Sequence, residues 1–411
     1  TVGVTERAIF FKRMRELARQ AAEAYLAQRE EAGYPWLQRP GISLLPPAQG
    51  ALMHLPIRQS NGGAEPPAIT AGSDVPFLFE IGVEELPASH LSGALTQLRE
   101  MVPATLDEAR IPHGKVHIWG TPRRLTVYVE EMALKQQDDD REVKGPPAKV
   151  AFDADGEPTR AAQGFARSQK VSVDDLTVQE VDGGEYVVAH RVIEGNPTVD
   201  VLADLLPEWI ATLNFPRSMR WNESAVSFSR PIRWLVAILD RYEVPFEYAG
   251  LESGRVTRGP RPDSSPEVAL SAAEDYEATM GAYNIIVDPE ARSAEILEQA
   301  QALAQEVEGH IPDDPALLEE VTHLVECPTA LLGSFEKRYL SLPQEVLIAV
   351  MKKHQRYFPV LNGRGRIMSY FVTVRNGGTK HLDKVRRGNE EVIRARYADA
   401  EYFYNQDSRY P

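Results

Sequence analysis

The segment MKKHQRYFPV, from Met351 to Val360, carries four basic or potentially basic side chains and no acid, although the whole chain has a formal net charge of −15. Between Val350 and Tyr397 there are twelve lysines and arginines and three acids, so this window carries +9 and the rest of the chain −24. A polyanion is repelled by most of such a surface and attracted to one region of it. A solvated face is the usual interpretation of a single charged helix. Here the bias extends well beyond one helix and predicts a localised phosphate-binding region.

Signatures of catalysis or metal binding are mostly missing. The sequence has no phosphate-binding P-loop, no G-x-S-x-G motif and no H-E-x-x-H motif. His113 and His117 are four residues apart, but Gly114 and the β-forming residues that follow argue against a pair of ligands on one helix. No metal site is predicted.

Two pairs of side chains could support acid–base or nucleophilic chemistry. His323 and Cys327 in HLVECP could face each other across a helical turn as base and nucleophile. A buried thiol that only packs is the favoured interpretation. Two of Glu80, Glu84 and Glu85 in FEIGVEELPASH could act as acid and base, but the favoured interpretation is that these acids end a strand and charge the start of a helix. No catalytic residue is therefore predicted.

The basic segment needs a helix to position it. Ser341 and Gln344 in SLPQEV have the spacing of a capping box, and Pro343 is typical of a first helical turn. This pattern predicts a helix from Ser341 to Phe358, ended by Pro359. Its apolar residues, with His354 and Tyr357 among them, fall on one arc, and Lys352, Lys353 and Arg356 lie opposite.

A strand and a second helix complete this region. RIMSYFVTV is typical of a buried strand, which would place Arg375 and Asn376 at its end. The run KHLDKVRRGN adds more cations, and Asn389 is predicted to cap a last helix.

Composition predicts a soluble protein of several domains. The chain has 411 residues, 43% of them hydrophobic, and no apolar run that could span a bilayer. A single cysteine excludes an internal disulfide and favours a reducing compartment, so a cytoplasmic location is predicted.

Helix and strand patterns of similar length interleave without βαβ regularity, which indicates an α+β fold with antiparallel sheets. Four parts are predicted: a helical tail over 1–38, a flexible Pro/Gly-rich linker over 39–75, an α+β domain over 76–255 and a second α+β domain over 256–411. QQDDDREVKGPPAKV is predicted to be an acidic, proline-rich loop.

Six blocks of sequence carry a family resemblance. FLFEIGVEELPA, IWGTPRRLTVYVE, GPPAKVAFDADGEPTRAAQGFARSQKV, FPRSMRWNE with FSRPIRWLVAIL, VECPTALLGSFEKRYLSLPQEVLIAVMKKHQRYFPV and ARYADAEYFYNQD resemble, in order and spacing, the N-terminal part of the beta subunit of bacterial-type glycyl-tRNA synthetase. The likeness covers about residues 75–411. The opening VTERAIFFKRMRELARQAAEAYLAQREEAGYP looks like the C-terminal tail of the alpha subunit, so 39–75 would join alpha to beta in a fused chain.

The resemblance implies a class II glycine–tRNA ligase whose catalytic domain, with its ATP and Mg²⁺, lies outside this chain. The implied partners are tRNA(Gly), the alpha-type catalytic domain and a second copy of the full-length fused chain, with no membrane. An editing hydrolase and a subunit-docking scaffold remain as alternative roles.

The predicted tRNA contacts form two groups. The first comprises Lys352, Lys353, His354, Arg356, Tyr357, Arg375, Asn376, Lys384, Arg386, Arg387 and Arg394. The second comprises Arg123, Arg124, Arg217 and Arg220, for which structural ion pairs are the alternative.

Overall fold

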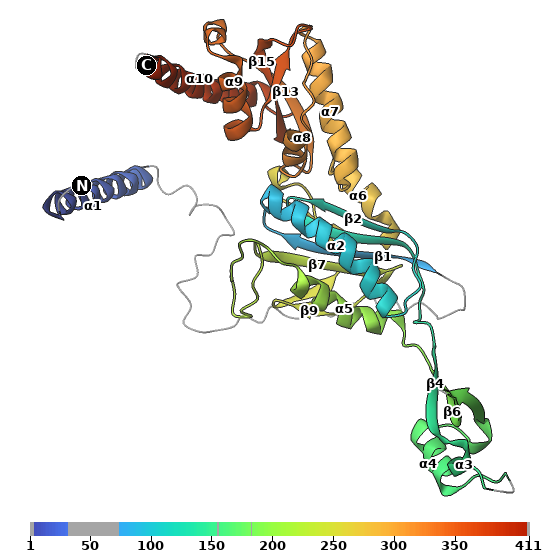
Figure 1. Cartoon of the computed structure of the whole chain (residues 1–411). Coiled ribbons are helices and arrows are strands. Elements are labelled where there is room, and N and C mark those ends of the chain that lie inside the picture. The colour runs from blue at the N-terminus through green and yellow to red at the C-terminus, as the bar shows by residue number, and fades with distance from the viewer. Residues whose placement is uncertain (1–3, 32–73, 154–155, 182, 409–411) are drawn as a thin grey trace. The chain divides into compact units, whose positions relative to one another are not determined.

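The computed structural model describes residues 4–31, 74–153, 156–181 and 183–408. The chain divides into two compact units, 1–63 and 64–411 (Figure 1). In the first, helix α1 (Val4–Glu31) exposes Met14 and Leu17 on its apolar stripe. The predicted linker lies outside the described residues except at its last two positions. None of the described helices is long and apolar enough to cross a membrane.

The second unit begins with a seven-stranded sheet, ordered β2-β3-β1-β7-β10-β9 with β8 paired to β7. Every pairing is antiparallel except the one between β10 and β7. Its strands are β1 (Val75–Val83), β2 (Val116–Thr121), β3 (Arg124–Met132), β7 (Ile232–Leu239), β8 (Tyr242–Glu243), β9 (Glu247–Tyr248) and β10 (Leu251–Gly254).

Both faces of this sheet are covered, which explains why β1 is apolar without alternation. Helices α2 (Ala88–Glu108) and α5 (Thr198–Thr212) lie across one face and bury Phe77 and Phe79 (Figure 1). On the other face, Leu78 and Trp234 pack with α6 (Tyr276–Ala282).

A smaller antiparallel sheet is inserted between β3 and α5, ordered β4-β6-β5. Its elements are β4 (Asp139–Pro147), α3 (Ala148–Ala151), α4 (Arg160–Gln169), β5 (Leu176–Val181) and β6 (Gly184–Ile193). The loop predicted for QQDDDREVKGPPAKV is wrong, because β4 forms there. Pairing with β6 satisfies its backbone although its side chains show no strand pattern.

The C-terminal part contains a two-stranded sheet and a three-stranded sheet ordered β13-β15-β14. Helices α7 and α8 pack on one face of the latter, and α9 and α10 on the other. The elements are β11 (Val256–Arg258), β12 (Glu267–Ala269), α7 (Pro289–Gln305), α8 (Pro315–Thr322), β13 (Pro328–Ser334), α9 (Gln344–Val350), β14 (Phe358–Leu361), β15 (Ile367–Asn376) and α10 (Leu382–Asp407). The α+β fold with antiparallel sheets is confirmed.

The helix predicted from Ser341 to Phe358 is shorter and less regular. The predicted capping box is wrong: Ser341 Oγ donates to the carbonyl of Arg338, and Gln344 Oε1 accepts from the backbone N–H of Ile367. Helix α9 is followed by a π-helical turn, Met351–Gln355, and Arg356 then adopts a left-handed backbone with φ of 56°. Phe358 therefore enters strand β14 instead of the helix.

Candidate nucleic-acid interface

Two of the three cations predicted on the exposed helix face are held by acids of α8 and its N-cap. Lys352 forms an ion pair with Asp314, and Arg356 Nε donates to Glu320 at 2.9 Å. Lys353 and His354 are both exposed. The prediction that His354 lies on the packing face is wrong, because the π-helical turn shifts the register of the side chains around the helix axis.

The second part of the basic window lies on α10, which begins at Leu382 and not near Asn389 as predicted. Near its start, Arg386 lies 3.6 Å from Asp383, and further along Arg394 pairs with Glu391. Lys384 and Arg387 are exposed and form no ion pair with any residue that the structure describes.

One hydrogen bond joins these two basic segments. Tyr357 donates its hydroxyl to Asn389 Oδ1 at 2.6 Å, and Asn389 Nδ2 donates to the carbonyl of Val385 within α10. The Tyr357 ring is buried and stacks on Phe371 at 4.6 Å. Burial raises its pKa to about 12, so the hydroxyl remains a donor at neutral pH. Tyr357 therefore packs inside the fold and holds Lys353 and the first turns of α10 in one region.

Arg375 and Asn376 are engaged by the protein backbone. Asn376 Oδ1 accepts from the N–H groups of Glu326 and Cys327, both at 3.1 Å, and Arg375 donates to the carbonyl of Lys380. Both side chains order the loops around the end of β15.

The four arginines of the second predicted group differ in burial. Arg217 and Arg220 are exposed in the loop before β7, where Arg220 Nε donates to the carbonyl of Ala225 at 3.1 Å. Arg123 and Arg124 are buried, with Arg124 fully enclosed. In this structure neither buried guanidinium is accessible to a nucleic acid.

Arg124 is the centre of a buried ionic cluster between the large sheet and the C-terminal part. Its guanidinium lies 3.7 Å from Glu80 and 3.6 Å from Glu326, and it donates to the carbonyl of Arg258 at 2.7 Å. Glu80 also accepts from Trp234 Nε1 at 2.5 Å. Glu80 therefore lies inside strand β1 in a buried polar network, and the prediction that it ends the strand and charges the start of a helix is wrong.

The remaining polar pairs from the sequence are separated or differently engaged. Cys327 donates its thiol to the carbonyl of Tyr283 at 3.8 Å, and His323 Nδ1 has no hydrogen-bond partner among the described residues. His117 Nε2 lies 2.6 Å from Glu130, whereas His113 Nδ1 contacts the carbonyl of Ile111. Among the described residues, no group of three or more histidines, cysteines or acids is placed to hold a metal ion.

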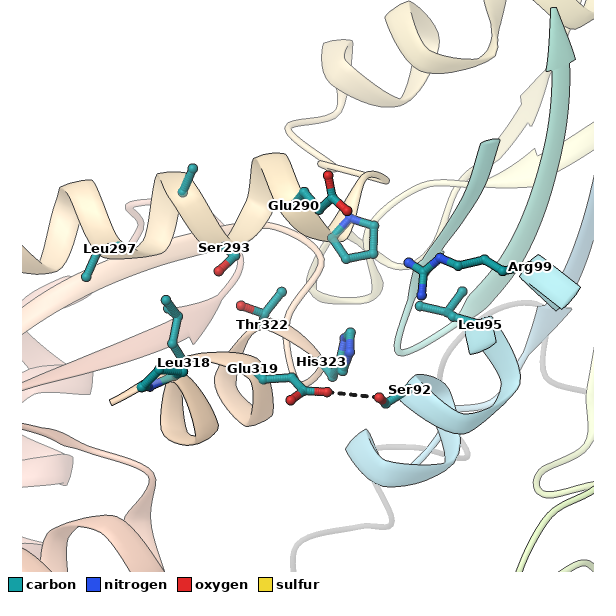
Figure 2. Close-up of a pocket in the computed structure, with 13 residues that line it drawn as sticks. Ser92, Leu95, Arg99, Glu290, Ser293, Leu297, Leu318, Glu319, Thr322 and His323 are labelled. Carbon is teal, nitrogen blue, oxygen red and sulfur yellow. Dashed lines mark hydrogen bonds between the residues drawn. The ribbon is translucent and has the colours of Figure 1, made fainter. Parts of the chain in front are cut away.

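His323 lies at the C-terminal end of α8 beside Thr322 and faces the region of α2 (Figure 2). Burial, followed by the charges of Arg292 and Arg99, lowers its pKa to about 4. The imidazole is therefore neutral at pH 7. The sequence carries no signal for this environment, because Arg99 and Arg292 come from different helices.

The protein-family model described as "Glycyl-tRNA synthetase beta subunit" matches residues 77–411 of this chain. The chain belongs to this family. It is 45% identical over 335 residues to the glycine–tRNA ligase beta subunit of Desulforamulus reducens, covering 82% of this chain and 48% of that protein. The glycine–tRNA ligase beta subunit of Bacillus subtilis is 44% identical over 333 residues, which cover 81% of this chain and 49% of that protein.

A third relative aligns over nearly the whole chain. The protein named glycine–tRNA ligase, chloroplastic/mitochondrial 2, of Arabidopsis thaliana is 42% identical over 409 residues, which cover 99% of this chain and 37% of that protein. The chain thus spans about half or less of the length of these relatives.

Proposed function

We propose that this chain is part of a glycine–tRNA ligase and that it binds and positions tRNA(Gly) while an alpha-type class II domain activates glycine with ATP and Mg²⁺. The family match over residues 77–411 supports the enzyme, and the alignment of 99% of this chain with the single Arabidopsis protein supports a fused alpha–beta chain. The full-length fused chain is proposed to act as a homodimer in the cytoplasm. The absence of a nucleotide-binding motif from the sequence supports a binding role for these domains.

The observation that carries the RNA-binding role is the grouping of accessible cations on two connected elements. Lys353 follows α9, and Lys384 and Arg387 lie in the first turns of α10, which the hydrogen bond between Tyr357 and Asn389 links to the first segment. Cations that form no ion pair can exchange their counterions for phosphates without first breaking an internal interaction. Lys352, Arg356 and Arg394 are paired and are assigned a smaller share.

The experiment replaces Lys353, Lys384 and Arg387 with alanine together and measures binding to a tRNA(Gly) transcript over a range of salt concentrations. Affinity should fall, and the log–log salt dependence should flatten by about 0.7–0.9 for each phosphate that is no longer neutralised. The free energy of unfolding should change by less than about 0.5 kcal/mol per site, because none of the three side chains is buried.

A control variant with the same change in net charge distinguishes a localised interface from general electrostatics. Lys115, Lys149 and Arg160 are exposed on other parts of the chain, and their joint replacement with alanine should leave affinity nearly unchanged. Equal losses of affinity in the two triple variants would show that binding follows net charge alone. Unchanged affinity and salt dependence in the first variant would exclude the proposed surface.

The alternative roles have their own readouts. Release of an amino acid from mischarged tRNA(Gly) by this chain would establish an editing hydrolase, although a thiol that donates to the carbonyl of Tyr283 does not favour one. Salt-sensitive association with an alpha-type catalytic domain, without any RNA affinity, would establish a docking scaffold. Glycine-dependent pyrophosphate exchange by the chain alone would contradict the proposed division of labour.

A further inference from the structure

The loop over 213–231, which joins α5 to β7, carries three arginines and one acid. The chain outside the basic window, this loop included, sums to −24, so the loop differs from its surroundings in the sign of its charge. Arg217, Arg220 and Arg230 are exposed, and none of them forms an ion pair within the part of the chain that the structure describes. A polyanion therefore meets a second accessible positive surface here.

The loop is held in shape by contacts with itself and with α2. An antiparallel bridge pairs Met219 with Phe228 through backbone hydrogen bonds of 2.8 and 3.1 Å. The rings of Phe228 and Phe215 pack with their centroids 4.7 Å apart. In the first turn of α2, the ring of His90 lies against Phe215 at 5.8 Å, and its Nδ1 lies 2.6 Å from Ser229 Oγ. Both ends of the loop are thus fixed beside His90.

These anchors bring together two arginines from opposite ends of the loop. Arg217 follows Phe215 by two positions, and Arg230 directly follows Ser229. Both charges act on the same imidazole: burial, followed by Arg230 and Arg217, lowers the pKa of His90. Two guanidinium groups near one ring are placed to contact neighbouring phosphates of one nucleic acid.

The acids near the loop do not cancel this charge. Glu84, which precedes α2, pairs with Arg233 and Arg261, each at 3.5 Å. Glu85 also pairs with Arg261, at 3.2 Å. Glu223, the acid of the loop itself, lies in the segment between the two bridged residues, away from the ends that His90 anchors. The charge at the anchored ends of the loop is therefore positive.

The start of α2 also brings this loop near the first basic segment. Ser89 and Gly93 of α2 line a cleft of about 930 Å³ that is also lined by Arg356. Glu319 and Glu320 line the same cleft, so a phosphate inside it would be repelled. The loop and the basic segment are therefore both close to the first turns of α2, and one RNA can contact both without entering the cleft.

We propose that Arg217 and Arg230 bind the phosphate backbone of the tRNA as a second contact, in addition to the basic surface around Lys353. This inference rests on the proposed function, because it assigns a further surface to the same RNA. Guanidinium groups suit the role, since their fixed fork of donors matches two phosphate oxygens. Arg220 is assigned a smaller share, because its Nε donates to the carbonyl of Ala225.

An acidic protein surface is the alternative partner of this loop. The core of a protein–protein interface is apolar and rich in aromatic residues. In this loop, all of which the structure describes, Met219 is the one large apolar side chain that is exposed. The surface therefore favours RNA over a protein.

The test replaces Arg217 and Arg230 with alanine in the 411-residue chain and measures binding to a tRNA(Gly) transcript over a range of salt concentrations. Affinity at about 0.15 M salt should fall about tenfold, and the log–log salt dependence should flatten by up to about 1.4–1.8 for two phosphates. Arg217→Lys with Arg230→Lys keeps the charge but loses the fork, and should recover part of the affinity. Arg160→Ala with Arg167→Ala, two exposed arginines of α4, is the matched control and should bind as the unaltered chain does.

His90 supplies a local readout that a change in overall charge would not move. A phosphate held by the two arginines adds negative charge near the imidazole, so RNA should raise the pKa of His90 in an NMR titration of histidine-labelled chain. In the double alanine variant without RNA, the pKa of His90 should already lie closer to its usual value, because two positive charges are gone. RNA should then change that pKa little.

Comparison with the triple variant of Lys353, Lys384 and Arg387 separates this proposal from the proposed function. Loss of affinity in the triple variant but not in the double one would overturn the second contact and leave the first. Loss in the double variant alone would support the loop and exclude the first surface. A pKa of His90 that RNA does not change would overturn the proposal. So would lost self-association at low salt with unchanged RNA affinity, which would assign the loop to a protein contact.

Discussion

Removal of the Glu326 carboxylate should destabilise the protein strongly. Glu326 is fully buried, and its oxygens lie 3.6 Å from both Arg123 and Arg124. It also accepts a hydrogen bond from Thr121 Oγ1 at 3.2 Å. In Glu326→Ala, the enclosed guanidinium of Arg124 would keep only Glu80 as its acidic partner, at 3.7 Å.

The expected magnitude follows from the geometry of this cluster. Removing one partner of a buried ion pair typically costs about 3–5 kcal/mol, because the other charge stays buried without compensation. The distances here exceed the roughly 2.7–2.9 Å of a direct charge-assisted hydrogen bond. Arg124 also retains Glu80 and the carbonyl of Arg258. We therefore expect a loss near the lower limit, about 3 kcal/mol.

Urea unfolding followed by tryptophan fluorescence measures this loss, because Trp234 lies 5.5 Å from the guanidinium of Arg123. Glu326→Gln should recover part of the stability, since an amide oxygen can still accept from Thr121. Glu336→Ala is the surface control: Glu336 is half exposed and pairs with Arg338 at 2.9 Å, so its loss should cost less than about 1 kcal/mol. A loss in Glu326→Ala no larger than in this control would refute the reasoning.

Three further predictions concern the interior. The pKa of His323 is about 4 in the folded chain and 6.5 in the reference state, so the unfolded state binds the extra proton between these values. The free energy of unfolding should therefore fall by about 1.6 kcal/mol from pH 6.5 to 5, and His323→Gln should lose this part of the pH dependence of urea unfolding. Leu347→Ala should cost about 2–5 kcal/mol in the same assay, since Leu347 is fully buried; a change below about 1 kcal/mol would mean that the site collapses around the smaller side chain. Gly82→Ala should cost about 1–3 kcal/mol or more, because a Cβ there would lie 1.9 Å from the ring of Trp234, and an unchanged thermal midpoint would contradict that clash.

Much of the fold could be predicted from local pattern. The α+β class with antiparallel sheets is observed, and the strand predicted in RIMSYFVTV is β15. Strand β4 could not be predicted in this way, because its side chains do not alternate and its pairing with β6 joins segments far apart along the chain. The same limit applies to the start of α10, where a cationic run without an apolar stripe is helical from Leu382.

For the candidate interface, the sequence predicted which cations cluster along the chain, but it did not predict which of them form ion pairs within the protein. Nothing local distinguishes Lys353, which forms no ion pair with the described residues, from Arg356, which pairs with Glu320 of α8. Arg124 has the same side chain as Arg387, yet one is enclosed in the core and the other lies on the surface.

By itself, the sequence determined the α+β class, the separation of charge into a basic window and an acidic remainder, and the family resemblance. Each of these depends on composition, on periodicity or on the order of motifs along the chain. The tertiary structure alone decided which cations are neutralised and where the buried ionic cluster lies. These features depend on contacts between distant segments, and the energy of a charge is set by its burial and its partners in space, neither of which is encoded in its neighbours along the chain.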